Sequence, residues 1–337
     1  MMRYSRTLPE DFVQLLLPGG PLRFIVDLVL RSGSCSTDKA LDLQLREDGE
    51  TRRMVTLYRG GTAILNMRYD SRAGELKLSA HKKHQDQFQR LRLSQSYAIK
   101  DSENLEAEIT GYLENVSVGP HHLREGGCEN WLSHRYGRLW QKDEWVAVDR
   151  EVVIGYKDRT EKEAVWGPIK KQFEEFVAKP PAPMGSKKTV GNELDCLLWQ
   201  PSTGEFLITE VKDGGDPAGV YRSPIQVAAY LAIWRQFVKD QPKDALDGVR
   251  GLLAQKQRLG LIPEGVPLPE RINALRPAII VQDPIRKNGC REKLDAVIKQ
   301  LQKDMPRCLD GLRLWAVEEN QLTKIKELRE IKDTWRE

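Results

Sequence analysis

The most constraining feature of the sequence is a pair of apolar runs joined by a turn. The runs cover roughly 190–199 and 205–212, and the segment between them, Gln200-Pro201-Ser202-Thr203-Gly204, is rich in turn-forming residues. This arrangement predicts a β-hairpin, whose far ends lie close together in space. The hairpin therefore places the carboxylates of Asp195 and Glu210 near one another, although fourteen residues separate them in the chain.

The second run ends in a Glu-x-Lys triplet, Glu210-Val211-Lys212. Alternate residues of a strand point to the same face, so Glu210 and Lys212 are expected on one face and Val211 on the other. Two carboxylates and a backbone carbonyl, that of Val211, are the oxygen ligands that Mg²⁺ or Mn²⁺ prefers. A nearby lysine can orient or deprotonate water, so the sequence predicts a site for metal-dependent phosphodiester hydrolysis.

A helix is expected directly after this site. Ser223-Pro224 has the residue order of an N-cap followed by a first-turn proline, and apolar spacing continues to about Val238. Gln226 and Tyr230 stand four residues apart, so they project from the same side of this helix. Alone they are better explained as ordinary packing residues, but here they follow the predicted site.

Asp195, the Glu-x-Lys triplet, Gln226 and Tyr230 together resemble the pattern of the PD-(D/E)XK nuclease superfamily, in its RecB-type exonuclease-like branch with a Gln-x-x-x-Tyr helix. The resemblance covers about 160–317 and leaves out the first half of the chain. It implies an α/β restriction-endonuclease-like core, with a mixed sheet flanked by helices. It also implies a Mg²⁺- or Mn²⁺-dependent deoxyribonuclease.

The same resemblance implies a role for each matching residue. Asp195 and Glu210 would be metal ligands, Lys212 would orient the attacking water, and Gln226 with Tyr230 would position metal or substrate. Many members of the superfamily place a further glutamate on the helix before these strands. Glu174 is the residue selected for that metal-ligand role, and a solvated surface glutamate is an equally good reading of it.

The sequence also departs from the superfamily's pattern. Leu194 rather than proline precedes the aspartate, and the first strand of the core is not evident in 180–188. Two other Glu-x-Lys triplets are present, Glu75-Leu76-Lys77 shortly after Asp70, and Glu330-Ile331-Lys332 near the end. Only the triplet at Glu210 lies between an aspartate-bearing hairpin partner and a helix, so the other two are interpreted as solvated surface pairs.

The chain divides into three predicted regions. A β-rich domain, 1–155, includes a predicted strand at 22–30 and a helical connector beginning at 101, and is assigned to substrate recognition or to binding a protein partner. A nuclease-like domain covers 156–320, and 321–337 is predicted as an amphipathic tail helix. Within the second domain, the predicted helices are 160–177 and 291–303 and the predicted later strands are 277–282 and 312–317, with a variable segment at 247–269.

Composition predicts a soluble protein, and the resemblance implies a nucleic-acid partner, with DNA as the expected substrate. The net charge of +4 permits an anionic partner without requiring one. Five cysteines without any C-x-x-C pair, and an N-terminal region without a signal peptide or membrane span, predict a cytoplasmic protein. No phosphate-binding loop of the Walker type is present, so no ATP-driven motor is expected. The alternative function is a non-catalytic nucleic-acid-binding or protein-binding module that retains the nuclease fold.

Overall fold

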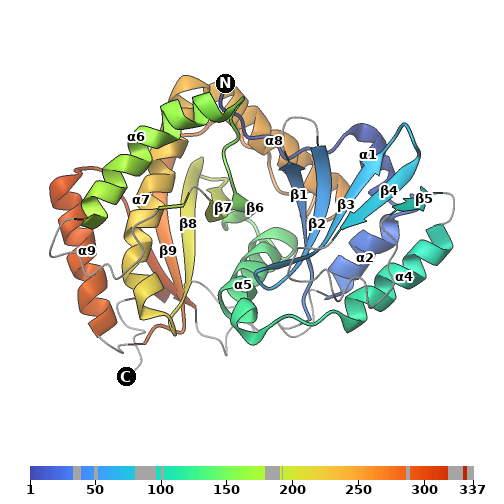
Figure 1. Cartoon of the computed structure of the whole chain (residues 1–337), viewed down its shortest axis with the longest axis horizontal. Helices are drawn as coiled ribbons and strands as arrows, with labels where there is room; N and C mark the ends of the chain where they lie inside the picture. Colours follow the sequence, from blue (N-terminus) through green and yellow to red (C-terminus); the bar gives the residue numbers. More distant parts are fainter. Residues whose placement is uncertain are drawn as a thin grey trace. The chain divides into compact units, whose positions relative to one another are not determined.

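The computed structural model describes residues 1–32, 39–48, 52–79, 96–99, 102–178, 190–191, 193–285, 289–317 and 329–331. The chain forms two compact units (Figure 1). Unit 1 contains Met1–Tyr4, Asp143–Val249 and Pro269–Glu337, and unit 2 contains Ser5–Lys142 and Arg250–Leu268. Each unit has one sheet with helices packed against it, so the predicted α/β class is confirmed.

Unit 1 has a six-stranded mixed sheet in the order β11-β10-β9-β8-β7-β6. Strands β6, β7 and β8 pair antiparallel, whereas β8, β9 and β10 run parallel. Parallel neighbours need a crossover connection, and helices α7 and α9 supply the two crossovers. The strands are β6 Val146–Val152, β7 Leu194–Gln200, β8 Glu205–Asp213, β9 Ala274–Gln282, β10 Arg313–Val317 and β11 Arg329–Glu330.

The helices of unit 1 follow from this strand order. Because successive right-handed crossovers run in the same direction across the sheet, α7 and α9 lie on the same face (Figure 1). Helix α7 packs against β8 and β9 and also contacts α6 and α9. The helices are α6 Arg159–Ala178, α7 Pro217–Asp240 and α9 Cys290–Asp304, so the helices predicted at 160–177 and 291–303 are confirmed.

Helix α7 begins earlier than predicted, at Pro217, and its N-cap position is Asp216. Ser223 and Pro224 lie inside the helix, so their interpretation as its start was wrong. Proline at position 224 has no N–H to donate to the carbonyl of Val220, four residues earlier. The hydroxyl of Ser223 donates to that carbonyl instead, at 2.7 Å. The Ser223 hydroxyl thus replaces the backbone hydrogen bond that Pro224 cannot donate, and the helix continues through both residues.

The strand that pairs with β7 on its outer side is β6, which lies before α6 in the chain. No strand is evident in the sequence of 180–188, a stretch that lies outside the described residues. The first residues of the chain also belong to this unit, because Arg3 forms a two-way bridge with Gly155. The Tyr4 hydroxyl donates to buried Asp149 on β6 at 2.8 Å.

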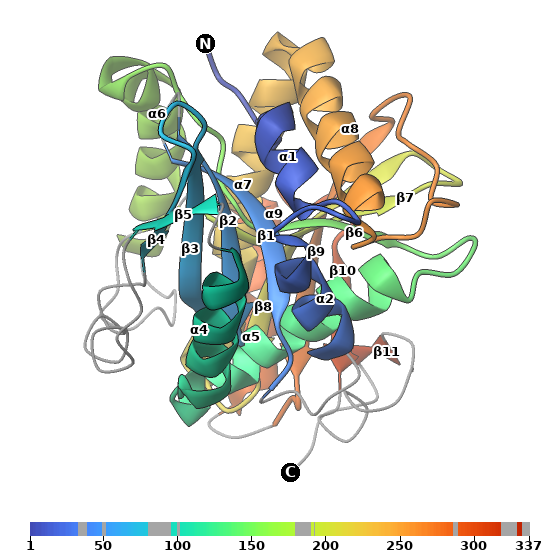
Figure 2. The same ribbon diagram turned by 90° about the vertical axis from the view of Figure 1, so that its right-hand side faces the viewer.

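Unit 2 has a five-stranded antiparallel sheet in the order β1-β2-β3-β4-β5, with helices around it (Figure 2). The predicted small antiparallel sheet is confirmed. Helix α2 packs on β1, α5 on β2 and α4 on β5. The elements are α1 Glu10–Leu16, α2 Arg23–Ser32, β1 Asp42–Asp48, β2 Arg52–Arg59, β3 Thr62–Asp70, β4 Glu75–Ser79, β5 Ser96–Ala98, α4 Ser102–Asn115, α5 Pro120–Ser133 and the π-helix η3 His134–Arg138.

The strand predicted at 22–30 is helix α2, so that prediction was wrong. Its β-branched residues favour a strand by composition, but Leu22, Ile25 and Val29 recur at helical spacing and are all buried. Arg23 pairs with Asp27 one turn later, at 2.9 Å. Spacing therefore outweighs residue type in this segment.

The segment predicted as variable at 247–269 includes most of helix α8, Pro242–Leu259. This helix begins in unit 1 and ends in unit 2. Its second half is hydrogen-bonded to β1, because buried Lys256 donates to the side chain of Gln44 at 2.9 Å. Arg258 also pairs with Glu10 of α1, at 2.5 Å.

The predicted domain boundary at 155/156 does not coincide with the division into two units, because β6 belongs to unit 1 and 250–268 belongs to unit 2. Most of the tail helix predicted at 321–337 falls outside the described residues, and Arg329–Glu330 form the short strand β11 rather than a helix. Among the helices of the described ranges, none has both the length and the apolar composition needed to cross a bilayer.

Candidate active site

The hairpin of β7 and β8 brings Asp195 and Glu210 together as predicted. Cys196 pairs with Thr209, so the residues next to them, Asp195 and Glu210, are cross-strand neighbours on one face. The carboxylate oxygen Oδ2 of Asp195 accepts a hydrogen bond from the Val211 N–H at 2.7 Å. This bond fixes the orientation of the Asp195 side chain relative to β8.

Lys212 lies between the two carboxylates. Its Nζ is 2.7 Å from Oε1 of Glu210 and 3.6 Å from Oδ2 of Asp195. Glu210 is 1% exposed and Lys212 is 8% exposed, so both charges are removed from bulk water. Buried charges of this kind require partners, and the three side chains supply partners to each other with one negative charge in excess. The arrangement favours an additional cation.

The backbone of β8 also contributes to the site. Lys212 Nζ donates to the carbonyl oxygen of Val211 at 2.8 Å, so this carbonyl faces the lysine. A carbonyl has two lone pairs and can accept a second interaction. The site lies toward the carboxyl end of β8, beside parallel β9, which is where ligands bind in open α/β sheets.

Helix α7 covers the site with Gln226 and Tyr230. Burial raises the pKa of the Tyr230 phenol well above its ordinary value of 10.0, and the charges of Glu210 and Asp195 raise it further. The side chain of Gln226 hydrogen-bonds the Tyr230 hydroxyl and opposes this shift. Tyr230 therefore stays protonated near neutral pH and is available as a hydrogen-bond donor at the site.

The first turn of α7 approaches the lysine closely at Gly219. A Cβ atom at this position would lie 2.6 Å from Oδ2 of Asp216 and 3.2 Å from Cδ of Lys212. A side chain at this position would therefore require the Asp216 carboxylate to move and the lysine stem to shift by a few tenths of an ångström. The sequence reading did not select Gly219 or Asp216. The only signal for them was their position in the glycine-rich stretch after the triplet.

Glu174 is not brought to this group. Its carboxylate pairs with Lys170, one turn earlier on α6, at 3.6 Å. In the part of the chain that the structure describes, Glu174 belongs to no group of acidic side chains close enough to share one ion. The structure thus favours the interpretation of Glu174 as a surface residue over its interpretation as a metal ligand.

The triplet in unit 2 has a different environment. Lys77 pairs with Asp70 at 2.8 Å, and both side chains are exposed. This is the solvated surface pair that the sequence predicts. In the third triplet, Glu330 lies on β11, and Lys332 is outside the described residues.

The donor atoms of the candidate site fit a hard divalent cation. Asp195 and Glu210 offer carboxylate oxygens and Val211 offers a carbonyl oxygen, which are ligand types that Mg²⁺ and Mn²⁺ prefer over nitrogen or sulfur. One oxygen of Asp195 is used by the Val211 N–H, and the other makes no hydrogen bond to a described residue. Asp195 thus keeps an oxygen that can bind an ion.

Comparisons of the chain with protein-family profiles, with curated proteins and with solved structures give no match. The functional interpretation therefore rests on the residues of the site and on the topology that positions them.

Proposed function

We propose that the chain is a metal-dependent nuclease that hydrolyses phosphodiester bonds, with DNA as its substrate. The observation that carries this proposal is the placement of Asp195, Glu210 and Lys212 around one point on β7 and β8. Tyr230 of α7 interacts electrostatically with all three. These are the residues on which the resemblance to the PD-(D/E)XK superfamily depends, and they come from three different elements.

The topology of unit 1 supports a restriction-endonuclease-like core. Three antiparallel strands, β6, β7 and β8, are followed by the covering helix α7 and by β9, which is parallel to β8. Strand β6 occupies the edge position next to the aspartate-bearing strand, where the first strand of such a core is expected. Its place in the chain before α6 is the feature that departs from the expected order.

Each residue has a role that follows from its position. Asp195 and Glu210, with the Val211 carbonyl, would hold Mg²⁺ or Mn²⁺, which when bound stabilises negative charge on a phosphate and lowers the pKa of a water ligand. Lys212, held between the carboxylates, orients a water molecule or the phosphate. Tyr230 donates a hydrogen bond from a hydroxyl that does not ionise near neutral pH, and Gln226 fixes that hydroxyl.

The test is cleavage by the full chain of linear, circular and single-stranded DNA and of RNA, in Mg²⁺, Mn²⁺ or EDTA. We expect cleavage only with a divalent ion, and we expect Asp195→Asn to reduce it by about a thousandfold, because several kcal/mol of charge stabilisation would be lost. Asparagine retains the shape and the acceptor for the Val211 N–H, so the fold is preserved. Undiminished cleavage by Asp195→Asn would overturn the assignment.

A second measurement separates a non-catalytic module from a nuclease. A bound ion raises the unfolding temperature of the native state by mass action, so Mn²⁺ should raise the Tm of the wild type and not that of Asp195→Asn. Absence of both cleavage and this Tm shift, with nucleic-acid binding intact, would support the non-catalytic module.

A further inference from the structure

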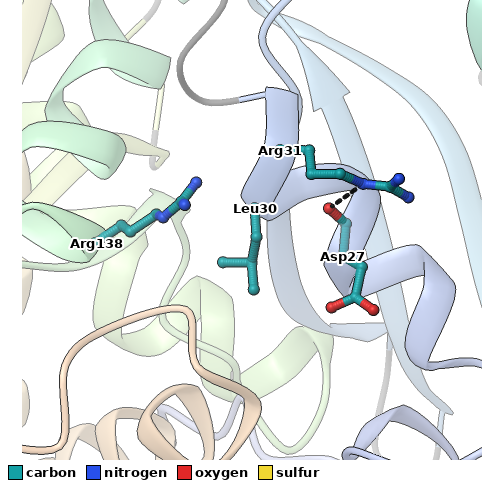
Figure 3. Close-up of a pocket in the computed structure, with 4 residues that line it drawn as sticks. All are labelled: Asp27, Leu30, Arg31 and Arg138. Atoms are coloured by element: carbon teal, nitrogen blue, oxygen red, sulfur yellow. Dashed lines mark hydrogen bonds between the residues drawn. The ribbon is translucent and has the colours of Figure 1, made fainter.

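A second candidate site lies in unit 2, in a pocket between the end of α2 and the π-helix η3. The pocket has a volume of about 590 Å³ and is lined by Asp27, Leu30, Arg31 and Arg138 (Figure 3). In this view Leu30 lies between the two arginines, with Arg138 on one side of it and Arg31 on the other. The pocket is open to solvent, so a ligand could reach it without a change in the fold.

The acidic residue that lines the pocket forms an ion pair with a nearby arginine. The carboxylate of Asp27 pairs with Arg23 at 2.9 Å, and Arg23 is itself fixed by a hydrogen bond to the carbonyl of Leu259 at 3.1 Å. Arg31 donates from Nε to the main-chain oxygen of Asp27, at 3.3 Å. This contact holds the Arg31 side chain beside Asp27, and its guanidinium points away from Leu30 (Figure 3).

Arg138 supplies a second positive charge. Among the described residues, it forms no ion pair with a carboxylate. Its charge acts on His134 at the other end of η3, where burial first and Arg138 second lower the histidine pKa. The backbone from His134 to Arg138 is a π-helix, a conformation that occurs frequently at functional sites.

Two arginines that line the pocket on opposite sides of an apolar side chain indicate the ligand chemistry. Each guanidinium presents a planar fork of donors that matches a phosphate, and Leu30 offers a surface for a sugar or base. We infer that this pocket binds a backbone phosphate of a nucleic-acid strand, and that unit 2 thereby contributes to substrate binding. The choice of nucleic acid over another phosphate-bearing ligand rests on the proposed function.

The test measures binding of labelled oligonucleotides, single-stranded and duplex, by fluorescence anisotropy over a range of salt concentrations. The full chain carries Asp195→Asn throughout, so cleavage does not interfere. We expect Arg138→Gln and Arg31→Gln each to weaken binding by about fivefold to tenfold and to reduce the slope of log K against log salt by about one. Arg138→Lys should recover the slope but only part of the affinity, because lysine keeps the charge and loses the fork.

The matched control is Arg72→Gln, which removes an exposed arginine of unit 2 from the turn between β3 and β4 and should change neither affinity nor slope. Equal Tm values show that the variants remain folded. Wild-type affinity and slope in both pocket variants would overturn the inference, as would tighter binding of poly-glutamate than of any oligonucleotide. If the wild type does not cleave nucleic acid but the pocket variants still weaken its binding, the proposed function fails and the inference stands.

Discussion

The two units carry the same arrangement of three residues in two different environments. In each unit an aspartate on one strand lies opposite a glutamate on the next, and a lysine follows two residues later. In unit 2 Asp70 pairs with Glu75 in register, and Lys77 reaches back to Asp70. In unit 1 the corresponding residues are Asp195, Glu210 and Lys212.

The difference lies in what surrounds each set. Asp70 and Glu75 flank a tight turn at the end of their hairpin, so solvent reaches them. Asp195 and Glu210 lie at the end of their hairpin that is far from the turn, where α7 covers them with Tyr230. A Glu-x-Lys triplet is thus common and chemically uninformative by itself. Burial beneath a helix makes its charges interdependent.

The largest contrast is expected for the two lysines. Replacing Lys212 by alanine leaves two carboxylates together in a buried site, and we expect a loss of about 3 kcal/mol in the free energy of unfolding and cleavage reduced by at least a hundredfold. Replacing Lys77 by alanine should leave cleavage unchanged and lower the free energy of unfolding far less, because solvent already screens Asp70. Urea denaturation and cleavage assays measure both. Equal losses in the two variants would show that burial does not distinguish the sites.

A smaller but more specific effect is expected at Gly219. In Gly219→Ala the new methyl group would displace Asp216 and the stem of Lys212, and we expect cleavage to fall by about tenfold or more, because small misplacements of a catalytic group are costly. The control is Gly167→Ala in α6, where a methyl group meets nothing within 4 Å. That variant should gain about 0.5–1 kcal/mol in unfolding free energy and retain activity. Unchanged cleavage by Gly219→Ala would argue against close packing at this point.

Tyr230→Phe tests the covering helix itself. Loss of the hydroxyl removes the hydrogen bond with Gln226, which corresponds to about 1 kcal/mol, and we expect cleavage to fall by about fivefold. The pH–rate profile between pH 6 and 10 should keep its shape, because burial raises the Tyr230 pKa above this range in the wild type. Tyr221→Phe, a change on the same helix, is the control. A pH profile altered by Tyr230→Phe would contradict the interpretation that the Tyr230 hydroxyl stays protonated over this pH range.

The smallest effect concerns the exposed pair. The hydrogen bond from Lys77 lowers the pKa of the Asp70 carboxyl below its ordinary value of 3.8. A lowered folded-state pKa contributes stability above the ordinary value, and this contribution is lost as the pH falls through the folded-state pKa. NMR titration should show the Asp70 pKa returning toward 3.8 in Lys77→Ala. An unchanged pKa would indicate that the pair does not persist in solution.

Local patterns predicted much of unit 1. The turn at 201–204, the apolar runs around it and the spacing of Gln226 and Tyr230 are all local signals, and the structure brings the residues that they select to one site. The start of α7 was misplaced because Ser-Pro has the same appearance at an N-cap and inside a helix where the serine replaces a lost hydrogen bond. The strand predicted at 22–30 is helix α2, since its β-branched residues favour a strand by type, whereas its buried residues follow helical spacing.

The remaining features depend on contacts between distant parts of the chain. Pairing of β6 with β7 across α6 leaves no mark on either strand's sequence, so local patterns do not identify β6 as the edge strand. The same applies to α8, whose buried Lys256 has the appearance of a surface lysine until Gln44 of β1 is placed beside it. The sequence does not distinguish a metal-ligand role for Glu174 from a surface position, because a partly exposed glutamate on a helix is most often a surface residue.

The interleaving of the two units has a consequence for the synthesis of the chain. Arg3 bridges to Gly155, and Tyr4 donates a hydrogen bond to Asp149. Neither contact can form until 5–142, which belongs to unit 2, has been translated. Unit 2 in turn lacks its last segment until residue 268 has been made. Neither unit can be completed during translation before the other is largely synthesised, and such non-local closure slows folding. A fragment cut at residue 156 would begin without β6, exposing the edge of the strand that carries Asp195.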